Sequence, residues 1–427
     1  MNQFTFDGKL RTTLLGFMGL GLLCLVLTFF NDDALHTRFW TNYLHNTVFF
    51  TGIAFVTLFV MAAFTTAWAG WYTVVKRVFE AFSLFLTPGL ILLSVVIIGV
   101  WGHFHHLYHW ADEHAVAADE VLKGKSSFLN KYWYTFGSLI FVGAWIFFAN
   151  KLRSLSLDED VSGSATFSHH HRLRIWAAVF LPIGGFTSAA MIWQWVMSID
   201  AHWYSTLFAW YSTVSWFVSA IALIILTIIF LKSNGYLENV TTEHLHDLGK
   251  YMFAFSVFWT YLWFSQYMLI WYANIGEETI YFRHRMDNYP VLFYGNLLMN
   301  FAVPFLILMR NDTKRKYGTL VLVAIVVFFG HWWDFFQMIK PGALLTAQEA
   351  LAHHAAEAGH AAEGTHEAAH HATSSFAMGF TIPGLLEIGT MLGFLAGFLY
   401  FMFSRLTKAS LTPQNDPYLE ESLHHHV

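Results

Sequence analysis

The sequence predicts an all-α integral membrane protein with about ten transmembrane helices arranged in bundles. Of its 427 residues, 56% are hydrophobic and only 12% are charged. A soluble protein of this length cannot bury so much apolar surface in a single core. Barrel strands would alternate polar and apolar residues, and the long apolar runs of this chain do not. Helices are therefore the expected spanning elements.

Ten apolar runs approach the length needed to cross the hydrocarbon core of a bilayer, and the fourth is the shortest. The loops between the first nine runs are short or moderate, so residues 1–427 are expected to form a single polytopic membrane domain. A basic segment precedes the first run as in a signal peptide, but no small-residue cleavage site follows it. The runs are Thr12–Phe30, Val48–Ala69, Phe82–Trp101, Tyr134–Phe148, Ile175–Ile199, Ser205–Leu231, Leu248–Trp271, Val291–Met309, Thr319–Met338 and Ile382–Phe403.

The distribution of lysine and arginine predicts that both termini are cytoplasmic. With the N-terminus inside, the inner segments hold 16 of these residues and the outer segments hold 7. The positive-inside rule favours that orientation. It places a loop rich in Ala, His and Glu, residues 342–380, on the periplasmic side. Its composition is compatible with a surface helix or with disorder, and its histidines lack a fixed chelating spacing.

The single cysteine, Cys24, limits the redox centres that the chain can hold. It excludes an internal disulfide, a thiolate-bound iron–sulfur cluster and a c-type haem motif. A b-type haem needs two facing histidines within the bilayer, and only His331 lies well inside a predicted span. We therefore expect no metal and no covalently bound cofactor, and partners would have to supply the redox centres.

Titratable side chains inside membrane spans are costly, and those of this chain share the outer level of the predicted membrane. His331 and Asp334 lie three residues apart on one helical face towards the outer end of the ninth run. Asp200 and His202 lie in the short joint between the fifth and sixth runs. These four residues are the candidate catalytic groups. Trp203, Gln266, Glu277, Glu278, His105 and His106 are the candidate ligand-binding groups at the same level.

A quinone is the candidate ligand for such a group of residues. It requires an apolar slot, a hydrogen-bond partner at each carbonyl and a titratable group that exchanges its protons. A structural interpretation stays open for each residue alone, because Trp and Tyr belong at membrane interfaces and Asp200 or Glu277 can cap helices. The histidines after the third run form either an interfacial belt or a proton-exchange site.

Two stretches resemble a known family. The first is Met197-Ser198-Ile199-Asp200-Ala201-His202-Trp203-Tyr204-Ser205-Thr206-Leu207-Phe208. The second is Asp247-Leu248-Gly249-Lys250 followed by Trp263 to Thr279. Both resemble the NrfD-like (polysulfide-reductase-type) membrane subunits of alternative complex III, a quinol:cytochrome c oxidoreductase. The length and motifs are most similar to the shorter of its two quinone-associated membrane subunits.

The resemblance implies a respiratory complex in a bacterial inner membrane. Its expected partners are a second NrfD-like membrane subunit, a periplasmic iron–sulfur subunit, and multihaem and monohaem cytochrome c subunits. A terminal oxidase and lipids are further candidate partners, and no nucleic acid is expected. The implied ligand is a quinone or quinol, either menaquinol or ubiquinol.

Three hypotheses for the function follow. In the first, the chain provides a quinone-associated cavity, a proton pathway or both near the periplasmic face. In the second, it is a structural and proton-conducting subunit that binds no quinone. In the third and weakest, it is an independent transporter, for which the shared outer level of polar groups offers no inner gate.

Overall fold

The computed structural model describes residues 3–163, 167–357 and 379–426, and these residues form helices and no strands. Nine helical segments of the described chain are long and apolar enough to cross a membrane. The long helices are α1 (Gly8–Phe30), α2 (Thr37–Thr66), α4 (Leu86–Trp101), α7 (Lys131–Ser162), α8 (Ser168–Trp195), α9 (Thr206–Ser233), α10 (Thr242–Ala273), α15 (Tyr317–Glu357) and α17 (Leu385–Leu406). A further span consists of α12 (Pro290–Leu297), a π-helical turn (Leu298–Ala302) and α13 (Val303–Leu308).

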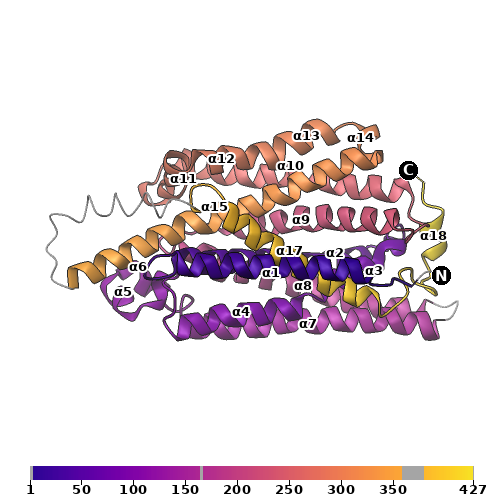
Figure 1. Cartoon of the computed structure of the whole chain (residues 1–427), viewed down its shortest axis with the longest axis horizontal. Helices are drawn as coiled ribbons and strands as arrows, with labels where there is room; N and C mark the ends of the chain where they lie inside the picture. Colours follow the sequence, from indigo (N-terminus) through magenta and orange to yellow (C-terminus); the bar gives the residue numbers. More distant parts are fainter. Residues whose placement is uncertain (1–2, 164–166, 358–378, 427) are drawn as a thin grey trace.

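All ten predicted runs are helical, and the fourth is much longer than expected. The run predicted at Tyr134–Phe148 belongs to the 32-residue helix α7. Helix α10 has the same length, but it is not among the nine apolar segments. Its central part is rich in Trp, Tyr, Ser and Gln. The helices lie side by side along one long axis, and both termini lie at the same end of the molecule (Figure 1). We call this end the terminal end.

The short helices connect the long ones at the two ends of the bundle. At the terminal end, α3 (Lys76–Ser83), α14 (Asn311–Arg315) and α18 (Leu419–Leu423) flank the long helices. At the opposite end lie α5 (Glu113–Ala118), α6 (Glu120–Lys125) and α11 (Gly276–Asn288) (Figure 1). We call that end the loop end. Two of the four candidate catalytic residues contact helices at this end: Asp200 pairs with Arg285 of α11, and His202 pairs with Asp119 at the start of α6.

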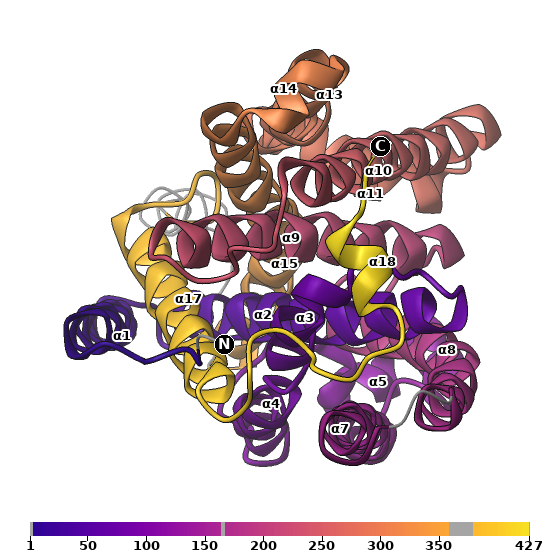
Figure 2. The same cartoon turned by 90° about the vertical axis from the view of Figure 1, so that its right-hand side faces the viewer.

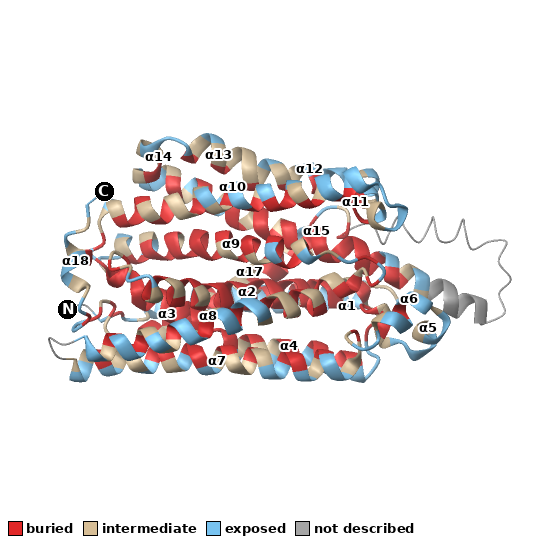
Figure 3. Cartoon of the chain, turned by 180° about the vertical axis from the view of Figure 1, so that it is seen from behind, coloured by how far each residue is buried: buried red, intermediate tan, exposed pale blue. Residues whose placement is uncertain are grey.

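Helices α2, α9 and α15 form the centre of the bundle, and α1 lies at its edge (Figure 2). Red, buried ribbon is concentrated in the central helices, whereas α7 is exposed over much of its length (Figure 3). Helix α1 packs along α17, where the backbones of Gly21 and Gly393 meet: a Cβ added to Gly393 would lie 2.5 Å from the Cα of Gly21. Small residues of this kind allow membrane helices to pack closely.

The loop predicted at residues 342–380 is in part helical. Helix α15 continues through Pro341 to Glu357, so that the first part of this tract extends a membrane helix. Alanine and glutamate favour this continuation because both are strong helix formers. The rest of the tract, residues 358–378, lies outside the described residues.

Candidate functional site

Asp334 is the centre of a buried polar cluster between four helical segments. It lies on α15 and is fully buried. Its carboxylate accepts hydrogen bonds from the Tyr211 hydroxyl on α9, from Trp259 Nε1 on α10 at 3.0 Å and from Asn296 Nδ2 on α12 at 2.6 Å. Among the described residues, no lysine or arginine pairs with this carboxylate. An acidic group buried among neutral donors only is suited to proton exchange.

His331 lies one helical turn from Asp334 on the same helix and is also fully buried. Its Nδ1 lies 2.9 Å from Ser215 Oγ on α9, and its Nε2 has no hydrogen-bond partner within the described part of the chain. Asn300 extends the cluster by donating to Asn296 Oδ1 at 2.6 Å and to the carbonyl of Gly330 at 2.9 Å. Asn300 lies in the π-helical turn, a local distortion that is frequent at functional sites.

A second polar cluster lies between α15 and two other helices, α2 and α17. Lys340 Nζ donates to Thr41 Oγ1 at 2.8 Å and to Asn42 Oδ1 at 2.5 Å. Asn42 in turn donates to Glu387 Oε1 at 3.0 Å, and Arg38 binds both carboxylate oxygens of Glu387, at 2.7 and 2.9 Å. Arg38 therefore binds the buried carboxylate directly, and Lys340 is linked to it through Asn42.

The side chain of Asp200 forms a partly buried ion pair. Its Oδ2 lies 2.9 Å from Arg285 Nη2 of α11. Arg285 also donates from Nε to the carbonyl of Gln337 at 3.3 Å. That carbonyl would normally accept from the backbone of residue 341, but Pro341 has no N–H. Gly342 leaves space for the carboxylate, because a Cβ there would lie 2.7 Å from Asp200 Oδ2.

Trp203, in the same segment between α8 and α9, also contacts α11. Trp203 stacks on Tyr281 of α11 with ring centroids 3.8 Å apart. The guanidinium of Arg285 also lies over the Tyr281 ring, 3.5 Å from its centroid. The joint between α8 and α9 is therefore fixed to α11 by one ion pair and one aromatic stack.

His202 points to a different place, a cleft at the loop end with a volume of about 560 Å³. Its Nε2 lies 2.5 Å from Asp119 Oδ2, and this hydrogen bond lowers the pKa of Asp119 to about 2. His109 also lines the cleft, with Nδ1 3.8 Å from Glu349. Histidines and carboxylates at a solvent boundary can take up and release protons near neutral pH. The cleft is also lined by His106, Asp112, His114 and Glu120.

The other predicted residues lie apart from these clusters. His105 is buried, and burial lowers the pKa of its ring to about 4; its Nε2 contacts the carbonyl of Val96 at 3.2 Å. Gln266 is buried on α10, and none of the described residues forms a hydrogen bond with its Nε2. Glu277 is exposed and Glu278 is half-buried in the first turn of α11, where acidic residues favour the helix dipole.

An apolar groove lies between α2, α8, α9 and α10. It has a volume of about 370 Å³ and is lined by aromatic rings that include Phe59, Trp210, Phe217 and Phe255. Trp210 and Phe217 belong to α9, which presents Tyr211 and Ser215 to the Asp334 cluster. The groove is suited to a hydrocarbon chain, but neither Asp334 nor His331 lines it.

Most residues that contact the predicted ones could not be identified from the sequence. Tyr211, Trp259, Asn296, Arg285 and Lys340 were not among the candidates. Asn296 and Asn300 offered a signal, because two asparagines one turn apart inside an apolar run are costly unless they are paired. A scan against protein-family models gives no match, and a search of curated proteins also finds none.

Proposed function

We propose that this chain is an NrfD-like membrane subunit of a respiratory quinol:cytochrome c oxidoreductase in a bacterial inner membrane. It would contribute a proton pathway near the periplasmic face, together with a quinone-associated cavity. The observation that carries the proposal is the cluster around Asp334, a carboxylate inside a membrane helix whose hydrogen bonds all come from neutral side chains. Quinol oxidation releases protons, and such a group can accept them.

The arrangement of the helices supports ten spans with both termini in the cytoplasm. Nine crossings would place the termini on opposite sides of the membrane, whereas both lie at one end of the molecule (Figure 1). Helix α10 runs alongside α9 and supplies the tenth crossing. The predicted excess of lysine and arginine on the inner side then corresponds to the terminal end.

The route for protons would lead from the Asp334 cluster to the loop end. Asp200 and Arg285 lie next along α15, at its contacts with Gln337 and Met338. The cleft lined by His106, His109 and His202 opens beyond this ion pair. Partner subunits with iron–sulfur and haem centres would accept the electrons at this end, because the chain has no ligand set of that kind in its sequence.

Substitution of Asp334 in the purified complex tests the proposal. Asp334→Asn should lower quinol turnover and proton release at least tenfold, because asparagine keeps the side-chain shape and cannot exchange a proton. The matched control is Asp287→Asn, at a carboxylate 64% exposed on α11. An assembled Asp334→Asn complex with unchanged turnover and proton release would contradict the proposal.

The second candidate function is a structural and proton-conducting subunit that binds no quinone. It is favoured by the full burial of Asp334 and His331 and by the separation of both from the apolar groove. Photo-crosslinking with an azido-quinone distinguishes the two. Label near Asp200–Phe208, His331–Asp334 or the groove would identify a quinone-binding subunit, whereas label confined to a partner would support the second candidate.

A further inference from the structure

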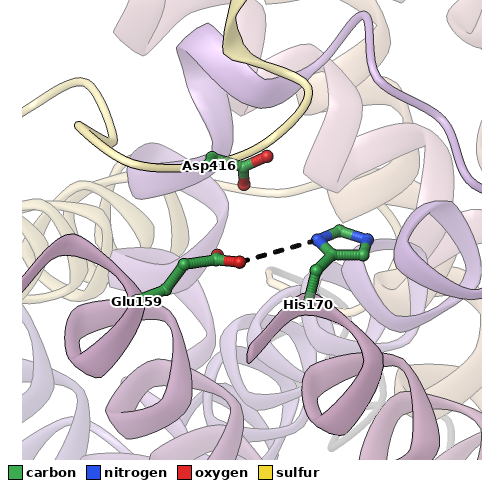
Figure 4. A group of neighbouring side chains, drawn as sticks. All are labelled: Glu159, His170 and Asp416. Atoms are coloured by element: carbon green, nitrogen blue, oxygen red, sulfur yellow. Dashed lines mark ion pairs between the residues drawn. The ribbon is translucent and has the colours of Figure 1, made fainter. Parts of the chain in front are cut away.

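Four buried groups meet at the terminal end, far from the candidate site. Lys76 comes from α3, Glu159 from the end of α7, His170 from the start of α8 and Asp416 from the segment after α17. Glu159, His170 and Asp416 are only 3%, 5% and 6% exposed. Figure 4 shows the carboxylates of Glu159 and Asp416 and the ring of His170 around one common space.

The ring of His170 is the unusual member of this group. Its Nδ1 lies 4.0 Å from Glu159 Oε1, and neither ring nitrogen makes a hydrogen bond to any residue that the structure describes. A buried imidazole whose nitrogens lack a hydrogen bond is costly and calls for a ligand. One donor atom each from Glu159, His170 and Asp416 lies within 4.8 Å of the others. The adjoining cavity, lined by Lys76, His170 and Asp416, has a volume of about 10 Å³, enough for one water-sized ligand.

The two carboxylates of this group share one ion-paired cation. Lys76 Nζ lies 2.7 Å from Asp416 and 3.8 Å from Glu159, so that one ammonium serves both. Arg77 and Arg153 are paired with Glu80 and Asp160. Arg174 lies over the ring of Trp68, which itself stacks on His170.

We propose that Glu159, His170 and Asp416 bind one divalent transition-metal ion, with Zn²⁺ as the best-fitting example. One imidazole and two carboxylates are a donor set that Zn²⁺ accepts, with a fourth position for water. Bonds of about 2.0–2.1 Å require the three donor atoms to approach to about 3.4 Å, which side-chain rotations can provide. The metal would displace the ammonium of Lys76 from Asp416, and the two cations compete for the same carboxylates.

The site departs from the expectation that the chain binds no metal, and it does not rest on the proposed respiratory function. Its ligands come from three separate segments, so that no local spacing in the sequence could reveal it. Metal binding would connect the C-terminal segment around Asp416 to α7 and α8. The expected effect is a more stable terminal end.

The first test is the zinc content of the purified full-length chain after dialysis against a weak chelator. Wild type should retain one more zinc ion per chain than His170→Gln. The control is His171→Gln, because His171 is the exposed neighbour of His170 and should keep the ion. Each variant keeps all other histidines of the chain, so zinc bound by those histidines contributes equally to every sample. Equal zinc content in all three proteins would overturn the proposal.

The second test uses Lys76→Met, which removes the competing ammonium. Without metal this variant should melt at a lower temperature, because it leaves two buried carboxylates unpaired. Added Zn²⁺ should restore the melting temperature, with an affinity at least about tenfold tighter than in wild type. The double variant Lys76→Met/His170→Gln should not be restored. If Lys76→Met binds zinc and wild type does not, the ammonium of Lys76 occupies the site in the wild-type protein, and the proposal is overturned.

Discussion

Arg285 binds Asp200 and, at the same time, the carbonyl of Gln337 that Pro341 leaves without a helical donor. One guanidinium thus connects the segment after α8 with the turn of α15 that contains Pro341, the interior proline of this helix. The proline is tolerated because a side chain from α11 replaces the missing backbone N–H. The ion pair and the uninterrupted course of α15 therefore depend on each other.

Replacement of Arg285 should strongly destabilise the loop end. Arg285→Met leaves the partly buried carboxylate of Asp200, 15% exposed, without its cation and removes the donor for Gln337. Loss of one partner of a fully buried pair typically costs about 3–5 kcal/mol, and the partial exposure of Asp200 places the expected loss near the lower end of that range. Thermal unfolding in detergent measures the effect. The control is Arg283→Met on the same helix, whose side chain is 82% exposed and which should change stability by less than about 0.5 kcal/mol.

The carboxylate of Glu387 should be essential for the packing of α17. Glu387→Gln removes the charge that Arg38 and Lys340 share, and leaves two cations at a site where the Glu387 side chain is 1% exposed. We expect a loss of about 3 kcal/mol or more in the free energy of unfolding. Glu238→Gln, an exposed position at the terminal end, is the control. Equal stability of the two variants would contradict the inferred role of this cluster.

The glycine contact between α1 and α17 should be sensitive to a single methyl group. In Gly393→Ala the new Cβ would lie 2.5 Å from the Cα of Gly21, so that the helices must separate. Overpacking of this kind costs about 1–3 kcal/mol. Gly397→Ala on the same helix has its nearest neighbour at 3.9 Å and should be tolerated. The measurement is the rate of disulfide formation between one cysteine placed on α1 and one placed on α17. This rate should fall in Gly393→Ala and stay unchanged in Gly397→Ala.

The contact between Asp119 and His202 should make the loop end sensitive to acid. The hydrogen bond from His202 lowers the pKa of Asp119 from 3.8 to about 2. Because the folded pKa is depressed, the stabilisation is present above about pH 4 and is lost as the pH falls towards 2. Pepsin cleavage within residues 112–131 should therefore rise between pH 4 and pH 2.

Asp119→Asn separates this charge effect from helix capping. Asparagine still caps α6 through Val121 and Leu122, whose backbone N–H groups Asp119 binds. It lacks the charge that pairs with His202, so the variant should be cleaved already at pH 4. Glu120→Gln, an exposed neighbour, should behave as wild type. An unchanged cleavage profile in Asp119→Asn would show that the pair does not order this loop.

The helical architecture could be predicted from the sequence because membrane spans are encoded locally. A run of about 20 apolar residues is visible without knowledge of its neighbours. The span predicted within α7 was shorter than the helix. The apolar run ends before Asn150, Lys151 and Arg153, whereas the helix continues through these residues. Hydropathy locates the apolar part of a span and not the end of its hydrogen-bonded helix.

The candidate site was predictable only in part, for a related reason. Burial of His331 and Asp334 followed from their position inside a span. Their partners did not, because Tyr211 lies 123 residues and Asn296 lies 38 residues from Asp334. Asp200 and His202, two residues apart, were expected to act together. The turn between them directs one towards Arg285 and the other into the cleft at the loop end.

Helix α15 has polar contacts on three of its sides. Trp332 and Lys340 face α2, His331 and Asp334 face α9 and α10, and the backbone at Gln337 binds α11. A rotation or an axial shift of this helix would break contacts with all of these neighbours at once. Under the proposed function, proton transfer along α15 would therefore proceed by rotamer changes and reorientation of hydrogen bonds while the helix stays in place, and an alternating-access motion of α15 is not expected.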